Sequence, residues 1–562
     1  MYKLFLCLRY LRSRLIAYFA VLGVAVCVFM VLVSVSVMNG FLHKIEQAAK
    51  GLFGDIVIES AGLTGLGYYD EFTRQVARQV PEVEAASPFI ITFGLLRVPA
   101  TDYRQAVQIA GIRLPERAGV TDFEDGLHFQ EGLSEPTFDP PVALLQDRLR
   151  AEAEHTERIR RSEMQQLKPG KAPSALRAKR LNRLETARLF QLQAAEILRQ
   201  AADYQDRMRR LQARLDAARL QAGGQDSKTV DELLIELEKL TEQAAIQPPE
   251  YRIILGLGIS GLSFRTEAGQ TVRYIVPGHK VVLSLVPLGQ RLSMTDISPN
   301  TATFTVVDDC RTDVSSIDSE IVYLPFETLQ RLNNMSAEYD ADDPKVQIAP
   351  ARCGQIHIKV APEHAQDKSL EAVCRKVEAA WQEFHRRRPQ AAGGDVSVQT
   401  WRQRQAKIIA PIEQQRTLVA IMFGIISTVA VVLIFVIFYM IVMQKTRDIG
   451  VMKAIGASAG GVAGIFLAYG AAVGLIGSIL GCVGGYFFVR NINPIRDAME
   501  RWFGFGGGFT KEFLLFEKLP NEVKPLTALI IMAGAVLAGV LGAVIPAVKA
   551  AKMQAVEALR YE

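Results

Sequence analysis

The sequence predicts an α-helical membrane protein with four transmembrane helices, a large mixed α/β extracytoplasmic domain after the first span, and an inserted antiparallel coiled-coil hairpin. Three observations support this fold class. Of the 562 residues, 49% are hydrophobic and only 22% are charged, which is too apolar for a wholly soluble chain. Four uncharged segments are each long enough to cross a bilayer. A stretch rich in Ala, Leu, Gln, Glu and Arg interrupts the long polar region between the first two of these segments.

The first apolar segment, residues 16–38, follows a cytoplasmic N-terminal segment, residues 1–15, that carries Lys3, Arg9, Arg12 and Arg14. Because positive residues are retained on the cytoplasmic side, we expect residues 39–416 to lie outside the cytoplasm. A cleaved signal peptide is the competing interpretation. The apolar run is longer than the core of a signal peptide, and no small-x-small cleavage site follows before Asn39, which favours a retained anchor.

The two ends of residues 39–416 alternate strand-like and helix-like segments, as in a mixed α/β domain. The expected strands are 55–60, 89–98, 271–276, 281–286, 302–307 and 355–360, and the expected helices are 70–79 and 368–386. Residues 256–261 match the dinucleotide fingerprint G-x-G-x-x-G. That fingerprint needs a following helix and an acidic residue about 20 positions later. The sequence offers neither, so we expect a glycine-rich turn.

Proline pairs bracket residues 142–247, whose composition predicts long helices. Apolar residues there alternate steps of three and four, as in a coiled-coil seam: Ala187, Phe190, Ala194, Ile197, Ala201, Tyr204, Met208, Leu211, Leu215, Ala218 and Ala222. A turn at Gly223 and Gly224 leads to a shorter returning helix, residues 230–244. This hairpin is either a self-contained decoration or an arm that docks a partner. We expect a short linker in place of residues 141–248 to leave the rest of the protein assembled.

The second span, residues 418–443, leads into a polar loop, residues 444–461. Ile449, Met452 and Ile455 recur there at helical spacing, and Gly456 is typical of a helix C-terminus. A short amphipathic helix in this place suits the grip of a partner protein. The alternative is an ordinary loop that lies on lipid headgroups.

The third span, residues 462–489, carries repeated Gly-x3-Gly patterns that favour close helix packing. An outer loop, residues 490–524, separates it from the fourth span, residues 525–548. The C-terminal tail, residues 549–562, carries Lys549 and Lys552, which again places positive charge on the cytoplasmic side.

Residues 443–450, with residues 453–457 behind them, resemble the coupling helix of permeases of the lipoprotein-releasing (Lol) system, part of the wider superfamily of macrolide-exporter and cell-division permeases. Residues 9–14 and 36–41 resemble signatures of the same family, and residues 546–551 and 557–562 are similar to its closing motif. One departure is that Gln554 and Ala555 stand where the family often has a proline.

The resemblance implies a permease subunit, itself not catalytic, of an ABC transporter in the bacterial inner membrane, with both termini cytoplasmic. It also implies that the chain couples ATP hydrolysis by a separate ATPase to release of lipoproteins. The implied partners are a cytoplasmic ATPase dimer, a second permease copy or paralogue, a periplasmic carrier or adaptor, and the lipoprotein cargo. The implied ATPase-coupling residues are Lys445, Thr446, Arg447, Asp448, Ile449, Gly450 and Lys453. The implied substrate path between the first two spans is lined by Val35, Met38, Asn39, Phe41, Phe423 and Ile426.

Missing motifs support this assignment. The sequence has no phosphate-binding G-x4-G-K-[ST] motif, so we expect no cofactor in this chain, and ATP and Mg²⁺ on the partner ATPase. It has no H-E-x-x-H zinc motif, and the net charge of +5 gives no reason to expect a nucleic-acid partner. Cys310, Cys353 and Cys374 allow at most one disulfide among them.

Two alternatives stay open. A macrolide-type exporter would work with a periplasmic adaptor, and a cell-division-type permease would activate a cell-wall hydrolase.

Overall fold

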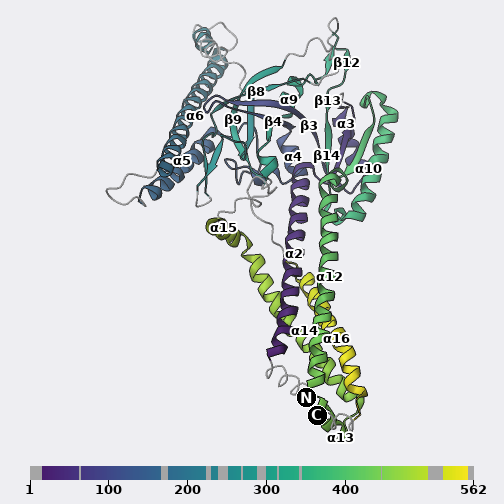
Figure 1. Ribbon diagram of the computed structural model, residues 1–562. Coiled ribbons are helices and arrows are strands. Elements are labelled where there is room, and N and C mark those ends of the chain that lie inside the picture. Colours follow the sequence, from purple (N-terminus) through teal and green to yellow (C-terminus); the bar gives the residue numbers. More distant parts are fainter. Residues whose placement is uncertain are drawn as a thin grey trace. The chain divides into compact units, whose positions relative to one another are not determined.

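The computed structural model describes residues 15–62, 65–165, 175–222, 230–237, 251–266, 270–287, 299–312, 315–340, 343, 345–444, 446–503 and 523–554. The chain divides into two compact units (Figure 1). Unit 1 combines residues Met1–Gln47 and Gln405–Glu562, and unit 2 is Ala48–Arg404.

Unit 1 is built from helices. They are the first part of α2 (Leu15–Phe53), α12 (Ala406–Gln444), α13 (Thr446–Ala454), α14 (Ala459–Arg490), α15 (Ile492–Phe503) and α16 (Pro525–Lys552). Among the described residues, Tyr18–Phe53, Ala459–Arg490 and Pro525–Lys552 are long and apolar enough to cross a membrane, and α12 contributes a shorter apolar segment, Ile434–Gln444. Several apolar helices are therefore confirmed, and the count of four spans remains a prediction. The predicted outer loop, residues 490–524, begins with a helix, because α15 occupies residues 492–503.

The glycine patterns of α14 bring helix backbones together, as the sequence predicts. A Cβ atom added at Gly477 would lie 2.8 Å from Val24 Cβ of α2, and one at Gly474 would lie 2.8 Å from Val536 Cα of α16. Such contacts are sterically forbidden, so only glycine permits this spacing. On α16, Gly542 in turn lies against Ile434 of α12. These contacts link the helices in the order α2, α14, α16, α12.

Unit 2 is a mixed α/β domain, as predicted, around one nine-stranded sheet. The strand order is β15 (Val396–Thr400), β1 (Ile56–Ser60), β14 (Gln355–Val360), β3 (Val83–Val98), β4 (Tyr103–Ile112), β10 (Ile321–Pro325), β5 (Tyr251–Gly256), β9 (Asn300–Cys310) and β8 (Lys280–Leu285). The six strands from β3 to β8 form a closed ring, because residues 94–97 of the long β3 also pair with β8. At the closure, a Cβ on Gly94 would lie 2.6 Å from Ser284 O, so a side chain there would keep β8 away.

Short strands and helices complete unit 2. They are β2 (Leu66–Gly67), β6 (Ser263–Arg265), β7 (Thr271–Arg273), β11 (Glu338–Tyr339), β12 (Gln347–Ala349), β13 (Arg352–Cys353), α3 (Tyr69–Gln79), α4 (Leu114–Val120), α8 (Ser315–Asp318), α9 (Phe326–Leu332), α10 (Asp367–Arg387), α11 (Trp401–Arg404), and the 3-10 helices η1 (Phe123–Gly126), η2 (Pro362–His364) and η3 (Pro389–Ala391). The fingerprint-like glycines form a turn after β5, as expected. The N–H groups of Leu257 and Gly258 bond to the carbonyls of Cys310 and Asp318, so they are not available to a phosphate. Cys310, Cys353 and Cys374 are free thiols.

The insert forms α5 (Val142–Gln165), α6 (Ala175–Ala222) and a helical stretch at residues 230–237. Near the domain, α6 packs against α5. Its buried face is Leu184, Ala187, Gln191, Ala194 and Leu198. The predicted seam was wrong at Ile197 and Ala201, which are both exposed, while Leu198 between them is buried. Farther out, Leu211 and Leu215 pack against Leu233, so the predicted return is present, and the coiled-coil geometry remains a prediction.

The insert is also part of the domain core. Leu149 of α5 and Ala194 and Leu198 of α6 form one apolar cluster with Phe129 and Val276 of the domain. A second cluster joins α5 and α6 to β7: Ile159, Leu184, Ala187 and Val272. Removal of residues 142–247 would open both clusters to water, and assembly of the rest of the protein without them remains a prediction.

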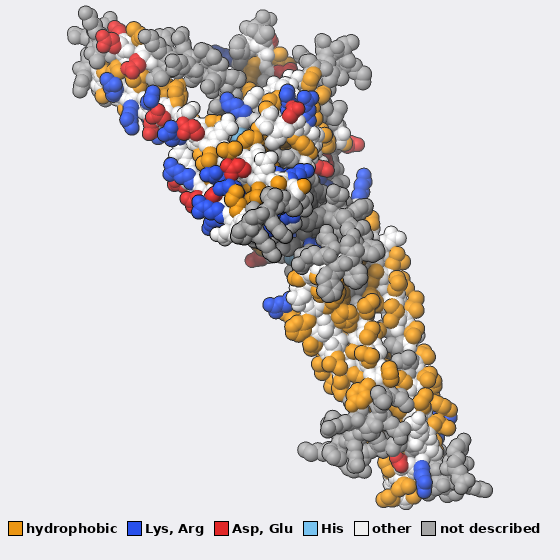
Figure 2. Space-filling view, turned by 60° about the vertical axis from the view of Figure 1, so that its left-hand side comes forward, with side chains coloured by type: hydrophobic (Ala, Val, Ile, Leu, Met, Phe, Trp, Pro, Cys, Tyr) orange, Lys and Arg blue, Asp and Glu red, His pale blue; other side chains and the backbone are white. Residues whose placement is uncertain are grey.

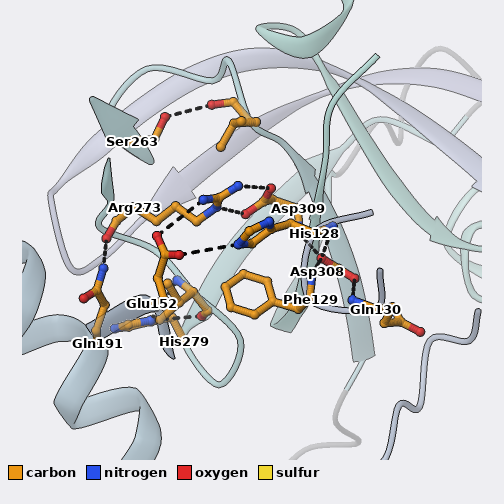
Figure 3. Close-up of polar contacts among 12 residues, drawn as sticks. His128, Phe129, Gln130, Glu152, Gln191, Ser263, Arg273, His279, Asp308 and Asp309 are labelled. Atoms are coloured by element: carbon orange, nitrogen blue, oxygen red, sulfur yellow. Dashed lines mark hydrogen bonds and ion pairs between the residues drawn. The ribbon is translucent and has the colours of Figure 1, made fainter. Parts of the chain in front are cut away.

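A buried ion-pair network reinforces this junction (Figure 3). Arg273 of β7 binds Asp309 of β9 through Nε, 2.5 Å from Oδ2, and Nη2, 3.2 Å from Oδ1. Its Nη1 lies 3.3 Å from Oε1 of Glu152 on α5, whose Oε2 is 3.4 Å from His128 Nε2. Gln191 of α6 donates to the Arg273 carbonyl at 2.9 Å. Burial raises the pKa of Glu152, but hydrogen bonds from His128 and Arg273 outweigh it, and the net pKa is lowered.

Asp308, next to this network, holds the loop that carries His128 (Figure 3). Its carboxylate accepts the N–H groups of His128, Phe129 and Gln130 at 3.2, 2.8 and 3.0 Å. Burial and the neighbouring Asp309 raise the pKa of Asp308 to about 7, while the backbone donors oppose that rise. The loop position is thus fixed by one buried side chain.

We predict that Gly481→Ala weakens the contact between α2 and α14. The added Cβ would lie 2.8 Å from Val28 Cβ, and such overpacking costs about 1–3 kcal/mol. Gly484→Ala is the matched control on the same helix, because its Cβ would lie at an ordinary 3.7 Å from Phe29. Unfolding of the purified chain in mixed micelles, titrated with a denaturing detergent, measures both. Equal stability of the two variants would contradict the packing argument.

We predict that Glu152→Ala loosens the insert from the domain, because buried Arg273 loses one of its two carboxylate partners, at a cost of about 1–3 kcal/mol. Hydrogen–deuterium exchange should rise in α5 and β7. Glu154→Ala, at an exposed position of α5, is the control.

The stabilisation by Glu152 should depend on pH. Since the folded-state pKa of Glu152 lies below its ordinary 4.5, the stabilisation is present above that pH and is lost as the pH falls through the lowered value. If exchange in α5 and β7 were still faster in Glu152→Ala than in wild type at strongly acidic pH, the ionised Glu152 carboxylate would not be the source of the stabilisation.

Candidate functional site

The short helix α13 lies between two apolar helices, and local hydrogen bonds define both of its ends. At its start, Thr446 Oγ1 donates to the Met443 carbonyl at 2.8 Å and so satisfies the last turn of α12. At its end, Gly456 adopts a φ of 102°, and the Ala457 N–H bonds to the Met452 carbonyl at 3.0 Å. This glycine-closed end fulfils the expectation that Gly456 stops the helix. The next helix begins at once, because Ser458 Oγ caps the Gly461 N–H at 3.1 Å.

One face of α13 is anchored on α14 and α16. Ile449 is fully buried in a cluster with Val462 and Phe466 of α14 and Ala547 and Ala550 of α16. Since this apolar face packs on protein, α13 does not depend on lipid headgroups to cover it. The interpretation as a loop resting on lipid is therefore the weaker of the two.

Lys453 has a structural partner that the sequence did not reveal. Its Nζ donates to the carbonyls of Ala551 at 2.5 Å and Met553 at 2.6 Å, at the C-terminal end of α16. These carbonyls lack helical partners, and a cation is favourable beside them. Lys453 was predicted to contact an ATPase, but its ammonium group is used inside unit 1. It fastens α13 to α16.

The opposite face of α13 is exposed. It consists of Arg447, Asp448, Val451 and Ala454, and we name these residues, together with the adjoining Ile455, the α13 outer face. Val451 is 44% exposed and Ile455 83% exposed. The sequence grouped Ile455 with Ile449 and Met452 on one stripe, and this was wrong, because Ile455 lies beyond the last helical residue. Val451 was missed, although its spacing of four from Arg447 places it on the same face.

The coupling residues proposed from the sequence therefore separate into two groups. Ile449, Gly450 and Lys453 face inward, and Arg447 and Asp448 face outward, with Thr446 capping the preceding helix. Lys445 lies outside the described residues. Within the described parts of the chain, no cluster of three or more His, Cys, Asp or Glu side chains could hold a metal ion. The α13 outer face combines two opposite charges with apolar side chains, which suits protein docking.

The proposed substrate-path residues lie on α2 and α12. Val35, Met38, Asn39 and Phe41 of α2 and Phe423 of α12 are half-buried, and Ile426 is 43% exposed. The core shared by the two helices lies elsewhere, among Ala20, Val21, Val24 and Val28 of α2 and Ile434 of α12. The structure thus does not gather the six residues into one cluster.

Much of α12 presents apolar side chains outward: Leu418, Ile421, Met422, Ile425 and Val429 are each more than half exposed. Figure 2 shows hydrophobic side chains covering the visible surface of the helical unit. In water such a surface would be unfavourable, so its natural surroundings are lipid or further apolar protein.

Two family models each match part of the chain. Residues 420–555 match the family model of the FtsX-like permease C-terminal region, and residues 18–158 match that of the MacB-like periplasmic core domain. The first match contains α13, and the second contains most of α2 and the beginning of unit 2.

Curated relatives carry the names of lipoprotein-releasing system transmembrane proteins. LolC of Xylella fastidiosa is 25% identical over 169 residues, which is 30% of this chain and 41% of that protein. LolC of Neisseria meningitidis is 23% identical over 316 residues, 56% of this chain and 66% of that protein. LolE of Haemophilus influenzae is 26% identical over 162 residues, 29% of this chain and 39% of that protein. In each case the match spans less than two thirds of the relative. The chain is thus similar to FtsX-like permeases over its C-terminal helices and to MacB-like periplasmic core domains over residues 18–158.

Proposed function

We propose that this chain is the permease subunit of an ABC transporter that couples ATP hydrolysis by a separate ATPase to release of lipoproteins from the bacterial inner membrane. The observation that carries the proposal is α13, which is anchored on α14 and α16 by Ile449 and Lys453 and exposes its outer face. A partner that moves this face would move the ends of two apolar helices directly. The names of the curated relatives support lipoprotein as the cargo.

The topology that goes with this function has four spans, cytoplasmic termini and a periplasmic unit 2. The assembly is a dimer of permease chains with two ATPase copies, and ATP and Mg²⁺ bind to the ATPase. A periplasmic carrier receives the lipoprotein. This chain's contribution is mechanical, since its residues transmit movement and enclose an apolar path.

Energetics explain why release needs such a machine. Each buried CH₂ group stabilises membrane anchoring by about 0.8 kcal/mol, so several acyl chains hold a lipoprotein in the bilayer by tens of kcal/mol. Spontaneous release is then negligibly slow. An energy source and a path shielded from water are both required.

We predict that Arg447→Asp and Ile455→Asp each reduce ATPase binding at least several-fold, because they place negative charge on the exposed docking face. Arg447→Lys, which keeps the charge, is the control. Co-purification of the ATPase and its stimulated turnover are the measurements. Ile449→Pro is a poor test, because Ile449 is fully buried and the variant would disturb the packing of α13 itself. Unchanged binding and turnover in both Asp variants would remove α13 from the mechanism.

We predict that photo-crosslinkers at Val35, Met38, Phe423 and Ile426 capture lipid-modified proteins in living cells. Crosslinkers at Leu537 and Leu541 of α16, which are 60% and 56% exposed, serve as controls for a lipid-facing surface. Capture of phospholipid alone at all six positions would contradict lipoprotein release. Capture of a periplasmic adaptor or a cell-wall hydrolase complex with this chain, without lipoprotein, would favour the exporter or cell-division alternative.

A further inference from the structure

The end of α2 and the short helix α11 contact each other in unit 2. The backbone N–H of Trp401 donates to the backbone carbonyl of Asp55 at 2.9 Å, and Lys50 Nζ lies 5.6 Å from the centroid of the Trp401 ring. The Arg404 guanidinium lies over the Phe53 ring, 4.8 Å from its centroid. These residues occupy special places in the chain, because α2 leads into the α/β domain and α11 immediately precedes α12.

A second, buried connection joins the same two segments. Arg117 of α4 donates one N–H to the Leu52 carbonyl in the last turn of α2, and its Nη1 lies 2.7 Å from His357 Nδ1. His357 Nε2 is 2.9 Å from Gln355 Oε1, and Gln355 Nε2 is 2.7 Å from Glu59 Oε1. Arg117, His357 and Gln355 are 1%, 0% and 2% exposed. Glu59 completes the series by pairing with Arg404.

The donors and acceptors of this series are fixed in direction. Arginine only donates, so His357 Nδ1 must accept and its Nε2 must carry the proton. Gln355 Oε1 then accepts from His357, and its amide nitrogen donates to the Glu59 carboxylate, which also accepts from Arg404. Burial, and then the Arg117 and Arg404 cations, lower the pKa of His357 well below its ordinary value, which keeps the ring neutral as this arrangement requires.

We propose that Arg117, His357, Gln355, Glu59 and Arg404 form a directional hydrogen-bond relay that positions the end of α2 and α11 as one rigid body. Each buried bond is costly to leave unmade, so the relay resists local rearrangement. A displacement of the segment before α12 is then passed to the end of α2 and the sheet. This positioning role rests on the proposed function, because it presumes movement that starts at α13.

The competing explanation is an ordinary ion pair between Glu59 and Arg404. The two explanations differ for the exchanged pair Glu59→Arg with Arg404→Glu. An ion pair works in either orientation, so the double variant would restore what each single variant loses. In the relay, an arginine at position 59 offers a donor where Gln355 needs an acceptor. Rotation of the Gln355 amide would move the His357 proton to Nδ1, directly opposite the Arg117 donor.

The first test is hydrogen–deuterium exchange of the full-length chain in detergent, with attention to residues 50–55 and 400–404. We expect about tenfold faster exchange there in Glu59→Arg and equally in the double variant, because in both the Gln355 amide loses its carboxylate acceptor. Arg404→Glu keeps that acceptor, so its effect should be smaller. The control is the same exchange at Glu383 and Arg387, an exposed ion pair on α10 with side chains 42% and 60% exposed, where no effect is expected. Recovery to within about twofold of wild type in the Glu59/Arg404 double variant would overturn the relay.

The second test measures ATP turnover by the ATPase that co-purifies with the chain. If the relay positions α2 and α11 to transmit movement from α13, Glu59→Arg and the double variant should lower the stimulated ATP turnover several-fold while ATPase binding is retained. Faster exchange with unaltered turnover would overturn the positioning role and leave a purely structural network. Neither test uses a lipoprotein, so failure of the lipoprotein proposal would be seen only in the crosslinking experiment.

Discussion

The close approach of α14 to its neighbours is the constraint on which unit 1 depends. Glycines on one side of α14 admit α2, and Gly470 and Gly474 on another side admit α16. Because α14 and α16 lie side by side, Ile449 packs against apolar residues of both, and Lys453 reaches the carbonyls at the end of α16. The position and the exposed face of α13 therefore follow from helix packing several turns away.

Unit 2 depends on a different kind of contact, in which charged side chains are buried with their partners. Arg273 joins the insert to the sheet through Glu152 and Asp309, and Arg117 joins the end of α2 to β14 through His357. A buried cation is costly without acceptors, so each arginine fixes the geometry of the elements that supply the acceptors it has. In both places the arginine connects segments that are far apart in the sequence.

The candidate site shows where local pattern and tertiary contact diverge. Helical spacing correctly placed Ile449 and Met452 on an inward face, but it could not show that Ile455 lies past the end of the helix. Lys453 was interpreted as a docking residue, because its bond to α16 joins residues about 100 positions apart. In the insert, the heptad pattern identified α6 but gave the wrong residue at 197, because α5 and the domain, rather than the returning helix, cover that part of α6.

The sequence by itself determined the apolar helices, the mixed α/β domain, the long helices of the insert, and the glycine end of α13. These features depend on local hydrophobicity, spacing and backbone freedom, which are written in neighbouring residues. Only the tertiary structure decided that β3 closes a ring with β8, that the insert shares the domain core, and that Lys453 caps α16. Each of these is a contact between distant segments, and its partner is set by how whole elements pack, which no local pattern encodes.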